Sequence, residues 1–182
     1  MKLVTAIAAT LALSSNAFAA NYSNQGITPA MLEQAQQAWG AALIQISKTY
    51  QEEGHEAATL LATQIIEQAY GYQLGDVLFK PTLASGEQTF RTTSEGALAY
   101  FVGGNDDFPY DTGFALKGWS EFGYENAAIF IHGDVAMTMG HVHLTNQYGD
   151  VTTVDKTWGF KLTDDDQLRI VLHHSSLPYS GY

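Results

Sequence analysis

Two stripes of apolar residues at helical spacing occupy the first third of the chain after its N-terminal segment. The first stripe follows Thr28-Pro29, a favourable helix start with Thr as N-cap and Pro in the first turn. Its apolar positions recur every three or four residues, at Met31, Ala35, Trp39, Leu43, Ile46 and Tyr50. Gly54 ends this stripe, and a second stripe runs over residues 57–70. We expect two helices whose apolar stripes pack against a sheet.

The middle of the chain reads as short elements separated by turns. Residues 77–79 form a brief apolar run, which indicates a short strand. Residues 92–102 fit a short helix with Thr93 or Ser94 as its N-cap and a glycine pair at its end.

The last third alternates between apolar and polar positions at strand spacing. Four such runs lie at residues 127–132, 136–145, 151–162 and 168–175. The connections between them are short and rich in Gly and Asp, which is typical of an antiparallel meander. Helices first and a meander afterwards predict an α+β fold, with the helices covering one face of the sheet.

The alternation also predicts which strand residues face the core. In the third run Val154, Trp158 and Phe160 share one face, and in the fourth run Ile170 and His174 do. We therefore expect Trp158 and His174 on buried faces, where a polar group needs a partner. The second run is apolar on both faces, and the helices of one domain can cover only one of them. This indicates self-association.

The first 19 residues have the order of a secretory signal peptide. Lys2 is followed by an apolar run over residues 3–13, a polar break, and small residues at Ala17 and Ala19. The apolar run is too short to span a bilayer, which needs about 20 apolar residues. We expect cleavage after Ala19 and a periplasmic or secreted product that has no membrane anchor after processing.

Composition narrows the class of the mature chain. Residues 20–28 read as a flexible lead-in, and residues 29–182 are enough for one domain with a sizeable core. The net charge is -11, with eight scattered Lys and Arg residues, so nucleic acid is not an expected partner. The chain has no Cys, which excludes disulfides, thiolate zinc sites and cysteine nucleophiles.

Several C-terminal motifs resemble a known family. They are Gly133-Asp134-Val135-Ala136, His143-Leu144-Thr145, Lys156-Thr157-Trp158 and the terminal run from Leu172 through His174 to Pro178. They resemble the association (hub) domain of calcium/calmodulin-dependent protein kinase II, of the nuclear transport factor 2-like (SnoaL-like) superfamily. Residues 75–82 and 96–104 look like stand-alone bacterial relatives of the hub. The resemblance implies N-terminal helices on a strongly curved antiparallel sheet, a conical pocket, and a homodimer or larger homo-oligomer.

The resemblance also implies where a ligand would bind. The hub pocket is lined by arginines, and matching strand by strand places those positions on His143, Trp158 and His174. This set suits a smaller or less anionic small-molecule ligand of unknown identity. The other candidate pocket residues are His141, Arg91 and Tyr100, with Lys80 as a further source of positive charge.

The histidines raise two chemical alternatives. His141 and His143 share a strand face and could chelate a metal with His174, but no supporting carboxylate is evident, so we expect neither metal nor cofactor. As general bases, His143 or His174 could work with Tyr100, Tyr124 or Glu125 as acids or orienting groups.

Two functional classes therefore remain. The first is an exported small-molecule-binding or oligomeric assembly module. The second is an isomerase or lyase-type enzyme that uses a pocket histidine as general base. The acidic composition and the lack of a readable Asp–His dyad favour the first.

Overall fold

A computed structural model describes residues 26–181 of the protein. The predicted signal peptide, 1–19, and most of the predicted lead-in lie outside the described residues. The helices are α1 (Pro29–Glu53), α2 (His55–Ala69) and α3 (Ser94–Val102). The strands are β1 (Leu78–Lys80), β2 (Trp119–His132), β3 (Val135–Asn146), β4 (Val151–Leu162) and β5 (Leu168–Ser176). None of the described helices is both long and apolar enough to cross a membrane.

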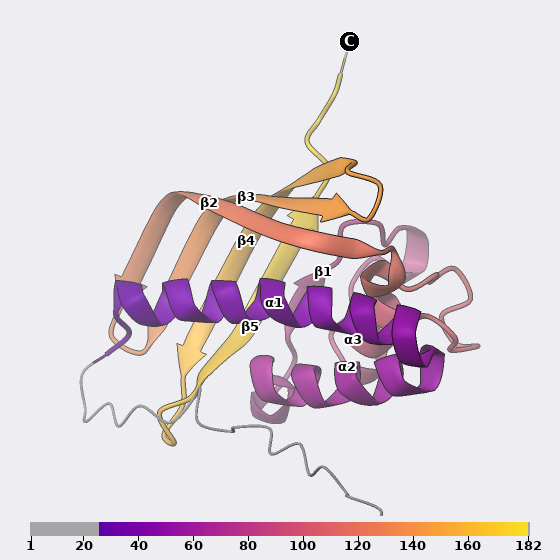
Figure 1. The fold of residues 1–182 in the computed structure, drawn as a ribbon. Helices are drawn as coiled ribbons and strands as arrows, with labels where there is room; N and C mark the ends of the chain where they lie inside the picture. Colours follow the sequence, from indigo (N-terminus) through magenta and orange to yellow (C-terminus); the bar gives the residue numbers. More distant parts are fainter. Residues whose placement is uncertain (1–25, 182) are drawn as a thin grey trace, which may run out of the picture.

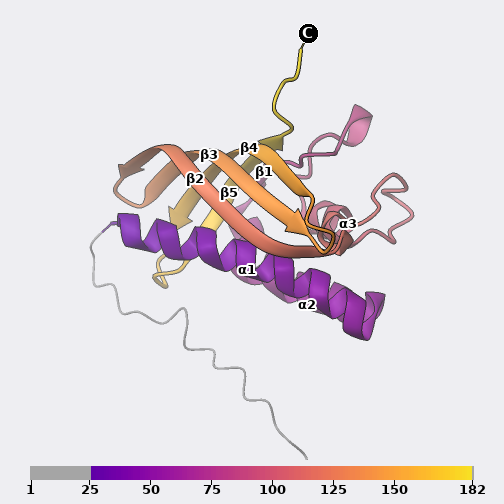
Figure 2. The same cartoon turned by 45° about the horizontal axis from the view of Figure 1, so that its top comes forward.

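The five strands form one sheet in the order β1-β5-β4-β3-β2. The pairs from β2 to β5 are antiparallel, as the sequence predicts, and β1 adds to the edge of β5 in parallel. Figures 1 and 2 show α1 running beneath the curved sheet, with α2 and α3 toward one end of the strands. The predicted α+β fold of the nuclear transport factor 2-like type is confirmed.

Local sequence signals set the helix ends. The Thr28 hydroxyl accepts a hydrogen bond from the Met31 amide at 3.3 Å, and the Thr93 hydroxyl caps α3 by accepting from Gly96 at 3.2 Å. Between α1 and α2, Gly54 has a φ of 92°, a conformation that favours glycine. The buried face of α1 includes Met31, Trp39, Leu43 and Ile46 of the predicted stripe and also Leu32, whereas Tyr50 of that stripe is exposed.

One strand is much longer than the sequence indicates. The predicted run at 127–132 is only the second half of β2, which begins at Trp119. A register irregularity between Asn126 and Ala128 interrupts the alternation, so the two halves do not read as one strand. Asn126 exchanges two hydrogen bonds of 2.9 Å with buried Gln36 of α1, which ties this irregularity to the helix.

A second irregularity changes which residues of β5 face the core. Gly159 pairs with Leu172 but Phe160 pairs with Ile170, so Val171 is an extra residue in β5. Beyond this bulge the faces are exchanged: His173 is buried and His174 is exposed. The prediction that His174 lies on a buried face is wrong because it assumed unbroken alternation through the strand.

Candidate functional site

Four polar side chains form a hydrogen-bonded chain between α1 and the sheet. The Trp39 indole N–H donates to the Tyr70 hydroxyl at 3.0 Å, and that hydroxyl lies 2.7 Å from His173 Nδ1. His173 Nε2 lies 2.5 Å from Lys156 Nζ. We call these residues, Trp39, Tyr70, His173 and Lys156, the buried polar chain.

Burial dominates the electrostatics of the buried polar chain. The exposed fraction is 5% for Lys156 and 2% for His173. Loss of solvation lowers the pKa of Lys156 to about 7 and holds the pKa of His173 well below its usual value. Burial also raises the pKa of Tyr70, so Tyr70 and His173 are neutral near neutral pH, where Lys156 is close to the midpoint of its titration.

Aromatic rings enclose the same groups. The Phe79 ring stacks on His173 with ring centroids 4.5 Å apart. Lys156 Nζ lies 4.6 Å from the ring centroid of Trp39 and 5.2 Å from that of Trp158. These contacts partly offset the cost of burying an ammonium group, because an aromatic face attracts a cation.

Three hydroxyl groups form a second cluster beside this chain, which we call the hydroxyl cluster: Thr82, Tyr100 and Ser175. The Thr82 and Ser175 hydroxyl oxygens are 2.7 Å apart in a buried hydrogen bond. The Tyr100 hydroxyl accepts from the Leu83 amide at 3.4 Å, and burial raises the pKa of Tyr100. The Lys80 ammonium donates to the Ser175 carbonyl at 3.1 Å, which brings a positive charge to this end of β5.

Sheet register joins the two clusters into one site. Lys156 and Ser175 are direct cross-strand partners in β4 and β5, so their side chains leave the same face of the sheet. Phe79 lies opposite His173 in the β1–β5 pair, and its ring also meets the Tyr100 ring edge-on at 5.8 Å. Beside them, the Trp158 indole N–H is buried and has no hydrogen-bond partner among the described residues. We call the two clusters together the interior site.

The predicted pocket set divides between the two faces of the sheet. Trp158 and Tyr100 are buried in the interior site. His143 lies on the outer face, with Nδ1 2.9 Å from the Thr153 hydroxyl, and His174 is exposed on the same side. The trio His143, Trp158 and His174 therefore does not converge.

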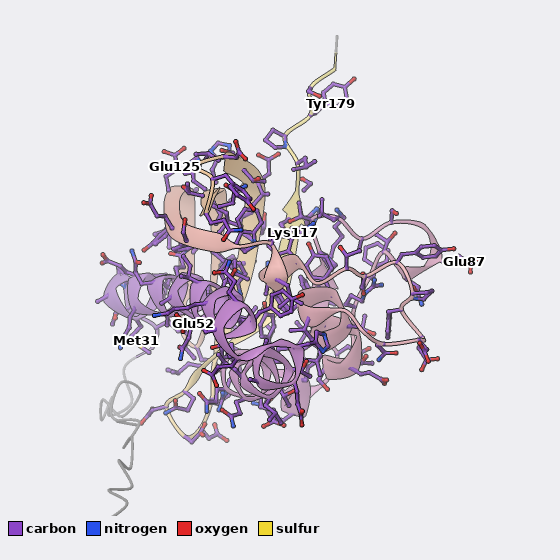
Figure 3. All side chains as sticks on the ribbon, turned by 45° about the vertical axis from the view of Figure 1, so that its right-hand side comes forward. Met31, Glu52, Glu87, Lys117, Glu125 and Tyr179 are labelled. Carbon is purple, nitrogen blue, oxygen red and sulfur yellow. The ribbon has the colours of Figure 1, made fainter. Side chains whose placement is uncertain are left out.

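The remaining polar candidates lie outside the interior site, and His141 and Arg91 form ion pairs with other residues. His141 is exposed between Glu125, at 3.0 Å, and Asp155, at 3.4 Å, and Figure 3 shows Glu125 at the margin of the molecule. Arg91 is buried in an ion pair with Asp111, and its Nη2 donates to both carboxylate oxygens at 3.0 Å. Tyr124 lies partly buried on β2. Within residues 26–181, none of these side chains forms a hydrogen bond or ion pair with the hydroxyl cluster.

Sequence reasoning missed six residues of the interior site: Trp39, Tyr70, Thr82, Lys156, His173 and Ser175. Trp39 was expected only as part of the apolar stripe of the first helix. One signal was available for Lys156, because it lies two residues from both Val154 and Trp158 and so falls in the buried phase of β4. The bulge in β5 reverses the alternation before His173 and Ser175, so the sequence pattern assigns both residues to the outer face. Thr82 follows the end of β1, where alternation gives no guidance.

The structure also contains a small cavity and a surface cleft, which lie apart from the hydroxyl cluster. A cavity of about 10 Å³, roughly the space for one water, is lined mostly by apolar side chains of α1 and α2, with Phe101 of α3. It meets the buried polar chain at Trp39 and Tyr70. A surface cleft between the start of α2 and the end of α3 contains His55 and Asp106. Within residues 26–181, no three His, Asp or Glu side chains are grouped so that they could hold a metal ion.

Three comparisons with known proteins point to the same family. Residues 30–177 match the family model described as metal-independent carbonic anhydrase. A protein of that name from Nostoc sp. (strain PCC 7120) is 56% identical over 156 residues, covering 86% of this chain and 76% of that protein. The crystal structure of an iota-carbonic anhydrase from a cyanobacterium, complexed with bicarbonate, has a TM-score of 0.86 and 53% identity, covering 90% of this chain and 99% of that one.

The hub resemblance extends only to the fold. A calcium/calmodulin-dependent protein kinase II association domain from Xanthomonas campestris has a TM-score of 0.57 and 17% identity, covering 90% of this chain and all 100% of that one. The much closer enzyme relatives overturn both functional expectations, the binding or assembly module and the isomerase or lyase-type enzyme with a histidine base. The chain belongs to the metal-independent carbonic anhydrase family.

Proposed function

We propose that the protein is a carbonic anhydrase that interconverts carbon dioxide and bicarbonate without a metal ion, and that the reaction takes place at the interior site. The observation that carries this proposal is the 56% identity to a relative named for that activity. The bicarbonate complex of the cyanobacterial neighbour supports the choice of substrate. The location rests on the buried hydroxyl cluster.

The hydroxyl cluster suits the addition of water to carbon dioxide. Each hydroxyl can donate one hydrogen bond and accept others, so the cluster can orient a water molecule and then bind the oxygens of bicarbonate. The bond between Thr82 and Ser175 uses one of their two protons and leaves the other available to a ligand. Around them, the rings of Phe79, Phe101 and Phe114 provide an apolar lining for an uncharged substrate.

Two further groups fit the anionic product. Lys80 supplies a positive charge at the Ser175 end of β5, within a chain whose net charge is strongly negative. The unpartnered indole N–H of Trp158 supplies a buried donor, and a bicarbonate oxygen would satisfy it. Of the candidates named from the sequence, we thus retain Trp158 and Tyr100 as ligand contacts and Lys80 as the source of positive charge.

Stopped-flow measurement of carbon dioxide hydration tests the proposal. The purified protein, dialysed against a strong chelator and checked for metal by elemental analysis, is expected to retain activity. Replacing one donor, in Ser175→Ala or Thr82→Val, is expected to lower kcat by roughly 10²-fold, the usual cost of losing a preorganised donor. Ser176→Ala, one position along on the opposite face of β5, is the matched control and should keep wild-type activity.

Two results would contradict this function. One is hydration no faster than buffer alone in the folded wild-type protein. The other is activity that disappears with the chelator and returns with added zinc.

We further propose that the chain is exported and cleaved after Ala19, and that the mature protein self-associates through the outer face of its sheet. The order of residues 1–19 supports the first point. N-terminal sequencing of protein recovered from an expressing cell is expected to begin at Ala20. An intact Met1 in all of the protein would contradict export.

A further inference from the structure

The direction of the hydrogen bonds in the buried polar chain depends on the charge of Lys156. A tryptophan N–H can only donate, so the Tyr70 oxygen accepts from Trp39. The two remaining links, from Tyr70 to His173 Nδ1 and from Nε2 to Lys156 Nζ, can each run either way. Because a neutral imidazole has one donor and one acceptor, choosing the direction of one link fixes the other.

In the first arrangement all three links of the chain are satisfied. The Tyr70 O–H donates to Nδ1, and His173 carries its proton on Nε2 and donates to Lys156. Lys156 must then accept, which only a neutral amine can do, because an ammonium group has no lone pair. Each of the three links has one donor and one acceptor.

In the second arrangement Lys156 donates to Nε2, and Nδ1–H donates to the Tyr70 oxygen. This arrangement accommodates an ammonium group. The Tyr70 oxygen then accepts from both Trp39 and His173, and its own O–H has no other acceptor recorded within the described part of the chain. A buried donor without a partner is unfavourable, so the charged state is the less stable of the two.

We propose that the buried polar chain is the proton acceptor for carbon dioxide hydration, with Lys156 neutral before the reaction and charged after it. This inference rests on the proposed function. It assigns a role to a lysine on the inner face of β4, next to the hydroxyl cluster.

The proton balance follows from the two arrangements. Water forms a bond from its oxygen to the carbon of carbon dioxide and loses one proton, leaving bicarbonate. In the neutral chain only the Tyr70 oxygen has a free lone pair, so it receives that proton and passes its own to Nδ1, while Nε2 passes its proton to Lys156 Nζ. One proton enters, Lys156 becomes an ammonium group, and the first arrangement becomes the second. Release of the proton to solvent buffer restores the neutral chain.

The contacts of Lys156 do not hold a proton on its nitrogen. They are the Trp39 ring from α1, the Trp158 ring on β4 and His173 on β5, and Ser175 is its cross-strand partner. Tyr70, at the end of α2, adjoins His173 on the other side of the imidazole. Within residues 26–181 no carboxylate forms an ion pair with Lys156. Its pKa of about 7 results from burial and suits a group that must both take up and release a proton near neutral pH.

Nitrogen-15 NMR tests the resting arrangement without reference to activity. At about pH 8.5 the wild-type protein is expected to show His173 as the Nε2–H tautomer, and at about pH 5.5 as the Nδ1–H tautomer, with the change following the titration of Lys156. The same Nδ1–H tautomer at both pH values would overturn the inference.

Kinetics test the catalytic role. In saturating buffer, log kcat of the wild-type enzyme is expected to rise with pH up to about 7 and then level off. Lys156→Met should lower kcat by roughly 10²-fold and remove this dependence, and Tyr70→Phe should do the same by breaking the relay. Lys161→Met is the matched control, because Lys161 lies on the same strand but is partly exposed beside Asp134.

The outcomes separate this inference from the proposed function. An active wild-type enzyme with an unchanged kcat and pH profile in both Lys156→Met and Tyr70→Phe overturns the relay and leaves the carbonic anhydrase proposal intact. An inactive wild-type protein overturns the proposed function, and with it the relay. If Lys156→Met fails to fold, Tyr70→Phe and the NMR measurement decide.

Discussion

At the scale of single residues, Lys156 is a buried basic group without a carboxylate partner among the described residues. Burial removes the hydration that stabilises an ammonium group. The cation–π contacts with Trp39 and Trp158 compensate for only part of this lost solvation energy. Keeping such a lysine makes the stability of the fold depend on pH. An apolar side chain in its place would remove that dependence.

The sign of this dependence can be predicted. In the unfolded chain Lys156 has its ordinary pKa of 10.5, and in the folded protein its pKa is about 7. Between these values the unfolded state binds more protons, so the free energy of unfolding rises with pH by about 1.4 kcal/mol per unit from this group. His173, whose pKa is also lowered, acts in the same direction below 6.5.

Urea unfolding of the wild-type protein and Lys156→Met at about pH 7 and about pH 9 checks this prediction. The wild-type protein should gain about 2 to 3 kcal/mol relative to the variant over that interval. Lys161→Met should show no such difference from the wild type. Parallel pH dependences of the wild type and Lys156→Met would contradict a lowered pKa.

The interior site could be predicted in part from these residues. Trp158 follows the regular alternation of β4, and Tyr100 follows the helical spacing of α3. Both side chains are buried. Lys156 has the same phase as Trp158 but was passed over, because a lysine in an apolar run is normally solvent-exposed. The hydrogen bonds of Tyr70 and Thr82 to β5 join distant parts of the chain, which no local pattern encodes.

At the scale of elements, two irregular strands determine what the site contains. The extra residue Val171 turns His173 and Ser175 inward, so the chemistry depends on a bulge that a propensity argument does not foresee. The helices were more predictable, since Thr28 and Thr93 cap them through their own side chains. Caps are local signals and bulges depend on tertiary pairing, which accounts for the difference.

The irregularity in β2 leads to a prediction about Gly140 in β3. A Cβ atom there would overlap the carbonyl oxygen of Glu125, because the two strands approach unusually closely beside the register shift. Gly140→Ala should therefore destabilise the protein by about 2 kcal/mol or more. Gly123 is the matched control, since a Cβ there meets nothing within 4 Å.

Thermal or urea unfolding measures both variants. Gly123→Ala is expected to be neutral or slightly stabilising, because alanine restricts the unfolded chain more than glycine does. Equal stability of Gly140→Ala and the wild type would show that β2 and β3 can move apart at no cost.

At the scale of the whole molecule, one end of the outer face of the sheet exposes apolar side chains. Phe130, Met137 and Met139 are 55%, 43% and 58% exposed, and they lie together because Phe130 pairs with Met137 across β2 and β3. The helices cover the opposite face (Figure 2). Apolar patches of this kind mark interaction surfaces, and a stable dimer would bury roughly 800 Å² on each partner.

Light scattering at micromolar concentration tests this surface. The mature wild-type protein is expected to be a dimer or larger, and Met139→Lys should shift it toward the monomer by placing a charge in the patch. Leu60→Lys is the control, because Leu60 is 62% exposed on α2, away from the outer face. A strictly monomeric wild-type protein would contradict self-association.

The hydrogen bond between Thr82 and Ser175 spans 93 positions of the chain. During synthesis the N-terminal helices, β1 and most of the meander are complete before β5 has emerged, so the two halves of the site meet last. Pairing between segments so distant in sequence is slow compared with local structure formation. A nascent chain that ends before β5 therefore lacks the Ser175 half of the interior site, which is completed only when the final strand docks beside β1.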